Sequence, residues 1–498
     1  MRLARFFDKQ LIEREVLLLF LFAAFIYVVP LVLADHYYID DSWRSLSAGM
    51  AWAGEGRFFT GFFYNALTFS TGAPNIFPLP LLIATLAIAL ALTRLTMHYY
   101  KEPTISCCFV LLPLWYNPFF LQNLSYQYDG PAMTLSLVAM IYATTFRGSA
   151  RLPIVLPGML IALGLGFYQL SINVFLGLCC VELIRGVNEG ASWDSLCSLI
   201  KYKLAQLLVG GLVYYLFAYP FIIQERLPLL DWGTNGFDQV EANIGILANK
   251  IVLLFHGANF WLLWAVLLCA AAGAVQVGLR VVKRQERAPK KILLGLICLL
   301  TLPALVLLVS GAALVFRDFN EGARTLMGFA TLLVFVFYLS HLGLGAIHPR
   351  LTVLLAIPLL SMLSLSYAYG RVLNVQKEFA NSVLLSLGHD IASHRHLREA
   401  RRIYMSITYS DHWLPGATGS FELMPVLVYI LNVDFFMLSE TLPRVGITNV
   451  VTEKERRNAT RVGYRGYPPL VDNKFYNIYL VGDYGFIVMK EPPRIEKR

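Results

Sequence analysis

A series of long apolar segments runs from residue 16 to residue 369 of this 498-residue chain. A membrane-spanning helix needs about 20 mostly apolar residues, and about eleven segments approach or meet that requirement. They cover residues 16–34, 78–97, 105–121, 131–146, 152–167, 172–184, 204–223, 259–282, 292–316, 325–344 and 352–369. The sequence therefore predicts a polytopic α-helical membrane protein with about 11 transmembrane helices. The segments 152–167 and 172–184 fit either two short spans or one helix broken near residues 168–171.

The composition supports this class of protein. Hydrophobic residues make up 57% of the chain and charged residues 15%, against about 45–50% and about 25% in soluble domains. A chain this apolar could not cover its surface with polar groups in water, which excludes a soluble globular enzyme and a disordered protein. The net charge of +9 is then an orientation signal in the membrane, and no nucleic acid is expected as a partner.

The distribution of lysine and arginine predicts which side of the membrane each loop faces. Basic residues precede the first span and recur in every second loop, above all in residues 280–291. Because basic residues accumulate in cytoplasmic loops, we expect a cytoplasmic N-terminus, an uncleaved first span and an external C-terminal segment. The opposite short loops contain few basic residues, namely Arg44, Arg57, Arg226, Arg317 and Arg324.

The composition changes after residue 369, and residues 376–498 are mixed and charged. The pattern predicts an amphipathic helix over 378–389 and strands over 402–408, 475–480 and 484–489, with Gly482-Asp483 as a hairpin turn. We therefore expect a transmembrane domain of residues 1–375 and a small external α/β domain of residues 376–498.

The first external loop, residues 35–77, is long and aromatic. It predicts a helix over 43–53 that lies along the membrane interface, with Trp43 and Trp52 as anchors. A second helix is expected over 60–67.

Two adjacent carboxylates, Asp40 and Asp41, stand at the start of this loop. Burial and mutual repulsion can raise the pKa of one of them, which suits a general base that acts on a hydroxyl group. The alternative is structural, with Asp41 or Ser42 as the N-cap of the interfacial helix. Asp129 has a similar ambiguity, because Asp-Gly-Pro also forms a good turn.

Arg317 and Arg324 bracket one short external loop that also contains Asp318 and Glu321. Arginine at a membrane interface is suited to bidentate binding of a phosphate or diphosphate. The alternative is snorkelling and local ion pairing. Arg44 and Arg57 are the next candidates for the same role.

Motifs of nucleotide and metal sites are absent from the sequence, which contains no P-loop, HExxH or GxSxG. His389, His394 and His396 do not share one helical face, so their spacing does not favour zinc. We expect no metal and no cofactor. The short basic loops also offer no nucleotide-sugar site, so the donor of any transferred group should be external and lipid-linked.

Three motifs resemble those of one known family. They are Tyr38-Ile39-Asp40-Asp41-Ser42-Trp43-Arg44, then Tyr126-Gln127-Tyr128-Asp129-Gly130-Pro131-Ala132, and in the tail Pro468-Pro469 followed by Tyr476-Asn477-Ile478-Tyr479-Leu480. With the layout of the whole chain, they resemble the O-antigen glucosyltransferases of the serotype-conversion type, also called the glucosyltransferase II family.

The resemblance implies a GT-C-like glycosyltransferase of the bacterial inner membrane. Such an enzyme transfers glucose, with inversion, from undecaprenyl-phosphate glucose to O-antigen repeat units of lipopolysaccharide at the periplasmic face. It works alongside a glucose-lipid synthase and a flippase. The resemblance makes Asp40 or Asp41 the base, and the substrate contacts are expected from Arg44, Tyr126, Gln127, Asp129, Arg317, Glu321 and Arg324.

Two other functions compete with this one. A flippase for a lipid-linked oligosaccharide should place ionisable residues in the middle of its spans, and the predicted span centres carry almost none. An O-antigen polymerase would also act externally on lipid-linked glycans, so it remains an alternative.

Overall fold

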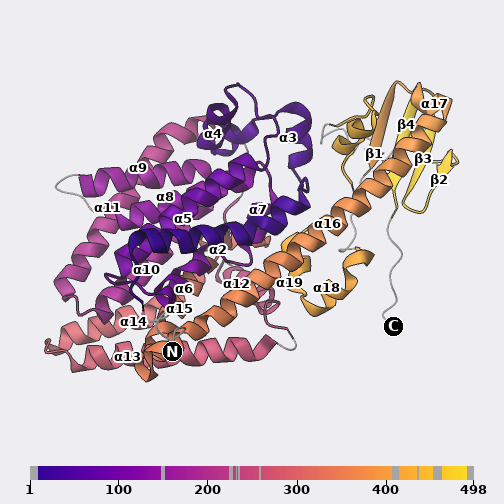
Figure 1. Ribbon diagram of the computed structural model, residues 1–498. Helices are drawn as coiled ribbons and strands as arrows, with labels where there is room; N and C mark the ends of the chain where they lie inside the picture. Colours follow the sequence, from indigo (N-terminus) through magenta and orange to yellow (C-terminus); the bar gives the residue numbers. More distant parts are fainter. Residues whose placement is uncertain are drawn as a thin grey trace.

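A helical bundle and a small β-sheet, connected by the long helix α16 (Ala356–Ser393), make up the computed structural model (Figure 1). The structure describes residues 9–146, 152–223, 228–231, 233, 236–256, 259–406, 414–433, 437–452 and 463–490. The other long helices are α2 (Glu13–Ala34), α5 (Leu79–Tyr99), α8 (Asp129–Thr145), α9 (Leu152–Phe167), α10 (Ile172–Asn188), α11 (Trp193–Ala218), α12 (Gly236–Val252), α13 (Phe260–Lys283), α14 (Ala288–Leu308) and α15 (Phe329–Ile347). The shorter ones are α3 (Asp41–Ser47), α4 (Phe58–Thr68), α6 (Ile105–Leu111), α7 (Phe120–Ser125), α17 (Arg395–Arg398), α18 (Thr418–Leu423) and α19 (Val426–Leu431).

Eight helices of the described chain are long and apolar enough to cross a membrane. Their outer faces carry bare apolar side chains, such as Leu208 on α11 and Leu299 on α14, which are 73% and 69% exposed. Apolar surface of this extent fits a hydrocarbon environment better than water. A helical membrane protein is thus confirmed. The remaining predicted spans, 105–121, 131–146 and 152–167, form shorter helices, so the number eleven stays a prediction.

The chain between residues 152 and 188 forms two helices and not one. α9 ends at Phe167, and a 3-10 turn (Gln169–Ser171) leads into α10. α9 packs mainly against α8 and α11, whereas α10 packs against α14. The two helices therefore diverge after the turn, which agrees with two short spans.

Small residues allow the closest helix packing in the bundle. Gly273 of α13 lies against the backbone of Leu339 in α15, and Gly343 of α15 lies against the backbone of Cys269 in α13. A Cβ atom at either glycine would collide with that backbone. Contacts of this kind are typical of helices that pack within a membrane.

The C-terminal sheet has four strands in the order β1-β4-β3-β2. β1 (Arg402–Ser406) runs parallel to β4 (Tyr484–Met489), while β3 (Tyr476–Val481) forms a hairpin with β4 and pairs with β2 (Val471–Asp472). The hairpin turns at Gly482, whose φ of +57° favours glycine. The predicted strands and hairpin are confirmed, except that residues 407 and 408 lie outside the described residues.

α16 continues without a break from the bundle to the sheet (Figure 1). The predicted helix over 378–389 is therefore only one part of it, and the predicted domain boundary at residue 375 falls inside it. Gly370 brings α16 against Pro30 of α2, and the far half of the helix buries Val383, Leu387 and Ile391 against the sheet. One helix thus belongs to both hydrophobic cores.

The first loop differs from its prediction. Residues 43–53 do not form one helix, because α3 ends at Ala48, where φ is +49°, and a separate 3-10 helix covers Ala51–Glu55. Trp52 was predicted as an interfacial anchor, but it is completely buried, because its indole N–H donates to a buried carboxylate of α8. The helix expected over 60–67 is present as α4.

Candidate active site

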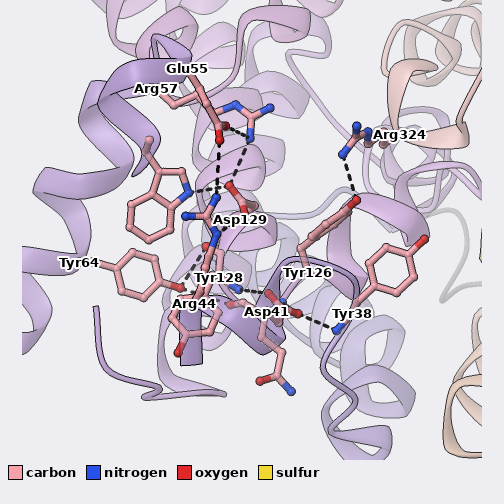
Figure 2. A network of polar contacts seen from close by, with 12 residues as sticks. Tyr38, Asp41, Arg44, Glu55, Arg57, Tyr64, Tyr126, Tyr128, Asp129 and Arg324 are labelled. Carbon is pink, nitrogen blue, oxygen red and sulfur yellow. Dashed lines mark hydrogen bonds and ion pairs between the residues drawn. The ribbon is translucent and has the colours of Figure 1, made fainter. Parts of the chain in front are cut away.

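The segment after α2, the turn before α8 and the turn before α15 meet at one end of the bundle. Asp41 joins the first two. Its Oδ2 accepts hydrogen bonds from the backbone N–H groups of Tyr38 and Gln127, both at 2.9 Å, and its Oδ1 accepts one from Tyr128 at 3.3 Å (Figure 2). Asp41 is fully buried. Its carboxyl group therefore fixes the end of α2 to the start of α8.

The environment of Asp41 affects its charge. Burial raises the pKa of the Asp41 carboxyl group from 3.8 to about 8, and the three backbone donors offset only part of that rise. Both oxygens are already engaged by backbone N–H groups. This geometry suits a positioning residue better than a group that must reach a substrate.

Asp129, the first residue of α8, lies among donors from the first loop. Its Oδ1 is 2.7 Å from the indole nitrogen of Trp52 and 3.2 Å from Nη1 of Arg57, and its Oδ2 is 3.3 Å from Nε of Arg44 (Figure 2). Glu55 adds a second carboxylate, 3.1 Å from Arg57 and 3.8 Å from Arg44. Two arginines thus meet two carboxylates in a buried network, and we call these four residues with Trp52 the Asp129 cluster.

Arg324 stands apart from that cluster, beyond the ring of Tyr126 (Figure 2). Its Nη1 donates to the Tyr126 hydroxyl at 2.9 Å, and its backbone N–H donates to Gln122 Oε1 at 2.6 Å. It forms no ion pair with a carboxylate of the described residues. Burial lowers the pKa of the guanidinium, but Tyr126, Tyr168 and Asp40 outweigh burial and keep it above its ordinary value. Arg324 is therefore a cation whose charge no direct partner neutralises.

Asp40 lies near this arginine. It occupies the N-cap position of α3, yet its side chain makes no capping hydrogen bond, and its carboxylate forms no hydrogen bond or ion pair within the described part of the chain. Its negative charge helps to raise the pKa values of Tyr126 and Arg324. Asp40 is only partly buried, so its carboxylate is accessible from outside the protein.

Comparison with known proteins identifies the family. Residues 29–335, more than half of the chain, match the family model described as glucosyl transferase GtrII. The chain belongs to this family. An uncharacterized 55.3 kDa protein in the gtrB 5' region of Salmonella phage P22 is 28% identical to it over 249 residues, which are 49% of this chain and 50% of that protein. The chain thus spans about half the length of this curated relative. No solved structure matches it.

GtrII membership confirms the resemblance to the glucosyltransferase II family found in the sequence. Both the Asp40–Asp41 turn and Arg324 lie inside the matched range. Within the described residues, no group of three or more His, Cys, Asp and Glu side chains could hold a metal ion.

The other predicted site residues of this GtrII chain lie at different distances from the centre. Gln127 binds Asp35 through its amide nitrogen at 3.0 Å, beside the site. Glu321 is exposed and pairs with Lys250 of α12 at 3.2 Å. Arg317 is exposed, and its side chain forms no hydrogen bond or ion pair with a described residue. Arg317 and Arg324 therefore lie in different environments, although the sequence grouped them.

Several residues of the GtrII site were missed by sequence reasoning. The side-chain oxygen of Gln122 accepts a hydrogen bond from the backbone N–H of Arg324, and its amide nitrogen donates one to the hydroxyl of Tyr38 at 3.1 Å. The hydroxyl of Tyr168 donates to the carbonyl of Arg324 at 3.4 Å. Gln122 could have been recognised as a candidate site residue, because it is a polar residue next to a long apolar segment. Glu55 lies two residues before Arg57 and could have been paired with it.

Proposed function

We propose that this protein transfers glucose from undecaprenyl-phosphate glucose to O-antigen repeat units at the periplasmic face of the inner membrane. The observation that carries the proposal is that Asp40, whose carboxylate makes no hydrogen bond within the described chain, lies near Arg324, a cation that forms no ion pair there. Attack by a hydroxyl group on a sugar phosphate needs a proton acceptor and a cation for the leaving group.

In the proposed reaction, Asp40 accepts the proton of an acceptor hydroxyl group. The oxygen attacks the anomeric carbon of glucose, and the bond to the phosphate oxygen breaks, so the configuration inverts. Arg324 binds the departing polyprenyl phosphate through charge-assisted hydrogen bonds. Tyr126, which already accepts a hydrogen bond from Arg324, can donate its own hydroxyl proton to the same phosphate.

The residues around this pair hold it in place. Asp41 fixes the backbone next to Asp40 through three hydrogen bonds. The Asp129 cluster anchors the first loop to α8, and Gln122 fixes the backbone of Arg324. Arg44 and Arg57 are neutralised by Asp129 and Glu55, so we assign them to the scaffold and not to the phosphate.

A lipid-linked donor is supported by an apolar cavity of about 310 Å³ in the bundle. It lies between α13, α15 and α16 and is closed by residues 251–256 and 423–426. Phe329, at the start of α15, lines it five residues after Arg324. An isoprenoid chain seated there would bring its phosphate end toward the turn before α15.

The test combines a deletion strain with a reconstituted reaction. Loss of the gene should leave O-antigen chain length unchanged and remove glucose from it, while purified protein should transfer labelled glucose from undecaprenyl-phosphate glucose to lipid-linked O-antigen. Shortened or absent chains in the deletion strain, without transfer in the purified system, would instead indicate a flippase or a polymerase.

A further inference from the structure

A second cavity lies where the first loop, α16 and the C-terminal region meet, and we call it the junction cavity. Its volume is about 140 Å³. Its walls come from three distant parts of the chain: the start of the first loop (35–37, 39 and 42), α16 between residues 376 and 384, and Val433 with residues between 437 and 444. Ile39 and Ser42, which flank the Asp40–Asp41 pair, are part of the lining. The cavity therefore borders the turn that carries the proposed base.

Five polar side chains that line the junction cavity have no hydrogen-bond partner among the described residues. They are the imidazole of His36, the hydroxyl of Ser42, the amides of Gln376 and Asn381 and the guanidinium of Arg444. Gln376 is only 7% exposed. A buried polar side chain without a partner costs stability unless something else satisfies it. Among these side chains only Gln376 and Ser42, which is 5% exposed, are buried, so the case for a bound polar molecule rests on these two.

Most of the polar groups of the junction cavity are neutral, which suits the recognition of hydroxyl groups. Lys377 is paired with Asp35 at 3.6 Å, and Arg444 lies over the ring of Tyr37, 3.9 Å from its centroid. Burial and the nearby Lys377 and Arg444 lower the pKa of His36 to about 4, so its ring is neutral at physiological pH. A neutral imidazole and two amides can each donate and accept hydrogen bonds, as recognition of sugar hydroxyls requires.

We propose that the junction cavity binds one sugar unit of the acceptor glycan and presents its hydroxyl group to Asp40. This inference rests on the proposed function, because it assumes a saccharide acceptor. The volume is small compared with the roughly 300–1,000 Å³ of drug-sized pockets, which limits the site to about one sugar. Gln376, Asn381 and Arg444 also lie beyond residue 335, where the family match ends. The residues of α16 and the C-terminal region that line the proposed acceptor site thus lie outside the residues that match the family model.

The test measures acceptor and donor dependence separately in full-length protein reconstituted in nanodiscs. The double variant Gln376→Ala/Asn381→Ala should raise KM for the acceptor about tenfold, as the loss of two neutral hydrogen bonds predicts, with KM for undecaprenyl-phosphate glucose unchanged. The matched control is Glu378→Gln, an exposed residue on the same helix that does not line the cavity. Thermal unfolding of each variant checks that it is folded.

A binding experiment without donor separates this inference from the proposed function. O-antigen oligosaccharide released from lipopolysaccharide by mild acid should give saturation-transfer NMR signals with the wild type and with Asp40→Asn, and weaker signals with His36→Ala or the double variant. An unchanged acceptor KM and unchanged NMR signals in folded variants would overturn the inference. A rise in donor KM alone for Arg444→Ala would also overturn it, because the cavity would then hold the donor phosphate. Absence of transfer by the wild type, with saccharide binding intact, would count only against the proposed reaction.

Discussion

Asp40 and Asp41 are adjacent in the sequence, but their carboxylates have opposite environments. Asp41 is fully buried and accepts three backbone hydrogen bonds, whereas Asp40 is partly exposed and makes none within the described chain. The difference follows from their places at the start of α3. We infer that one carboxylate fixes the backbone and the other remains available for chemistry.

The first prediction tests this division. Asp40→Asn keeps the shape of the side chain and removes the proton acceptor, so kcat should fall by about 10²- to 10⁴-fold with donor KM unchanged. Asp41→Asn should keep most of its turnover and lose stability instead. Steady-state assays with purified enzyme and thermal unfolding of both variants provide the comparison. If Asp41→Asn alone abolished turnover in a folded protein, the two roles would be reversed.

The second prediction concerns the donor phosphate. Arg324→Ala removes a charge-assisted contact, and donor KM should rise about 10- to 100-fold. Arg324→Lys keeps the charge but loses the bidentate fork, so its effect should be smaller. Arg317→Ala is the matched control, because this exposed side chain lies in the same loop and forms no hydrogen bond or ion pair with the described residues. Equal effects of the Arg317 and Arg324 changes would show that the phosphate site extends along the loop.

The Asp129 cluster gives a prediction about stability. The side chains of Arg44 and Asp129 are 2% and 4% exposed, and removal of one partner from a buried ion pair costs about 3–5 kcal/mol. Arg44→Ala should therefore lower the unfolding temperature in detergent strongly. Arg395→Ala, which breaks an exposed pair with Glu399, should change stability by less than about 1 kcal/mol. Similar small effects of both changes would mean that the cluster does not anchor the loop.

The fourth prediction is a pH dependence of stability. Burial raises the pKa of Asp41 to about 8 in the folded protein, above its ordinary 3.8, so the native state holds the proton more tightly than the unfolded chain. This contribution is complete below pH about 4, declines as the pH rises and is lost above pH about 8. The unfolding temperature should fall between pH 5 and pH 8 in the wild type. Asp41→Asn should reduce that slope, and an unchanged slope would assign it to other groups.

The fifth prediction concerns orientation. Since basic residues are concentrated in alternate loops, the C-terminal sheet and the Asp40–Arg324 site should both be periplasmic. Alkaline phosphatase fused after residue 498 should be active, and the same reporter in the loop at residues 284–288 should be inactive. The reverse pattern would put the site in the cytoplasm, where a nucleotide sugar would have to be reconsidered as donor.

Much of the architecture could be predicted because it depends on local patterns. Apolar runs of helical length marked the spans, and Gly482-Asp483 marked the hairpin that the sheet contains. The Asp40–Asp41 turn was also recognisable, since two carboxylates next to a membrane span are unusual. Local patterns could not show which of Asp40 and Asp41 is available as the base. That depends on the backbone N–H groups of Gln127 and Tyr128, which lie 86 and 87 residues away from Asp41 in the sequence.

The roles of the arginines could not be predicted either, because they also depend on residues that are distant in the sequence. The sequence favoured Arg317 and Arg324 for the phosphate and kept Arg44 and Arg57 as the next candidates, but it did not show that Asp129, brought close by the fold, neutralises Arg44 and Arg57. Trp52 was predicted to be an interfacial anchor, but its indole N–H donates to the carboxylate of Asp129. The continuity of α16 was missed because the apolar composition ends at residue 369, and this change was interpreted as a domain boundary. A helix can continue from an apolar into a polar environment without a break.

That single helix also restricts how the protein can change over time. An α-helix turns by about 100° for each residue, so one residue inserted into α16 between Gly370 and Gln376 would swing the whole sheet around the helix axis. Gln376 and Asn381 would leave the junction cavity together. In the proposed acceptor site, substitutions along the outer half of α16 would change the side chains that face the glycan and keep the cavity, whereas insertions or deletions would remove it. A change of acceptor should therefore proceed by exchange of side chains on a helix of fixed length.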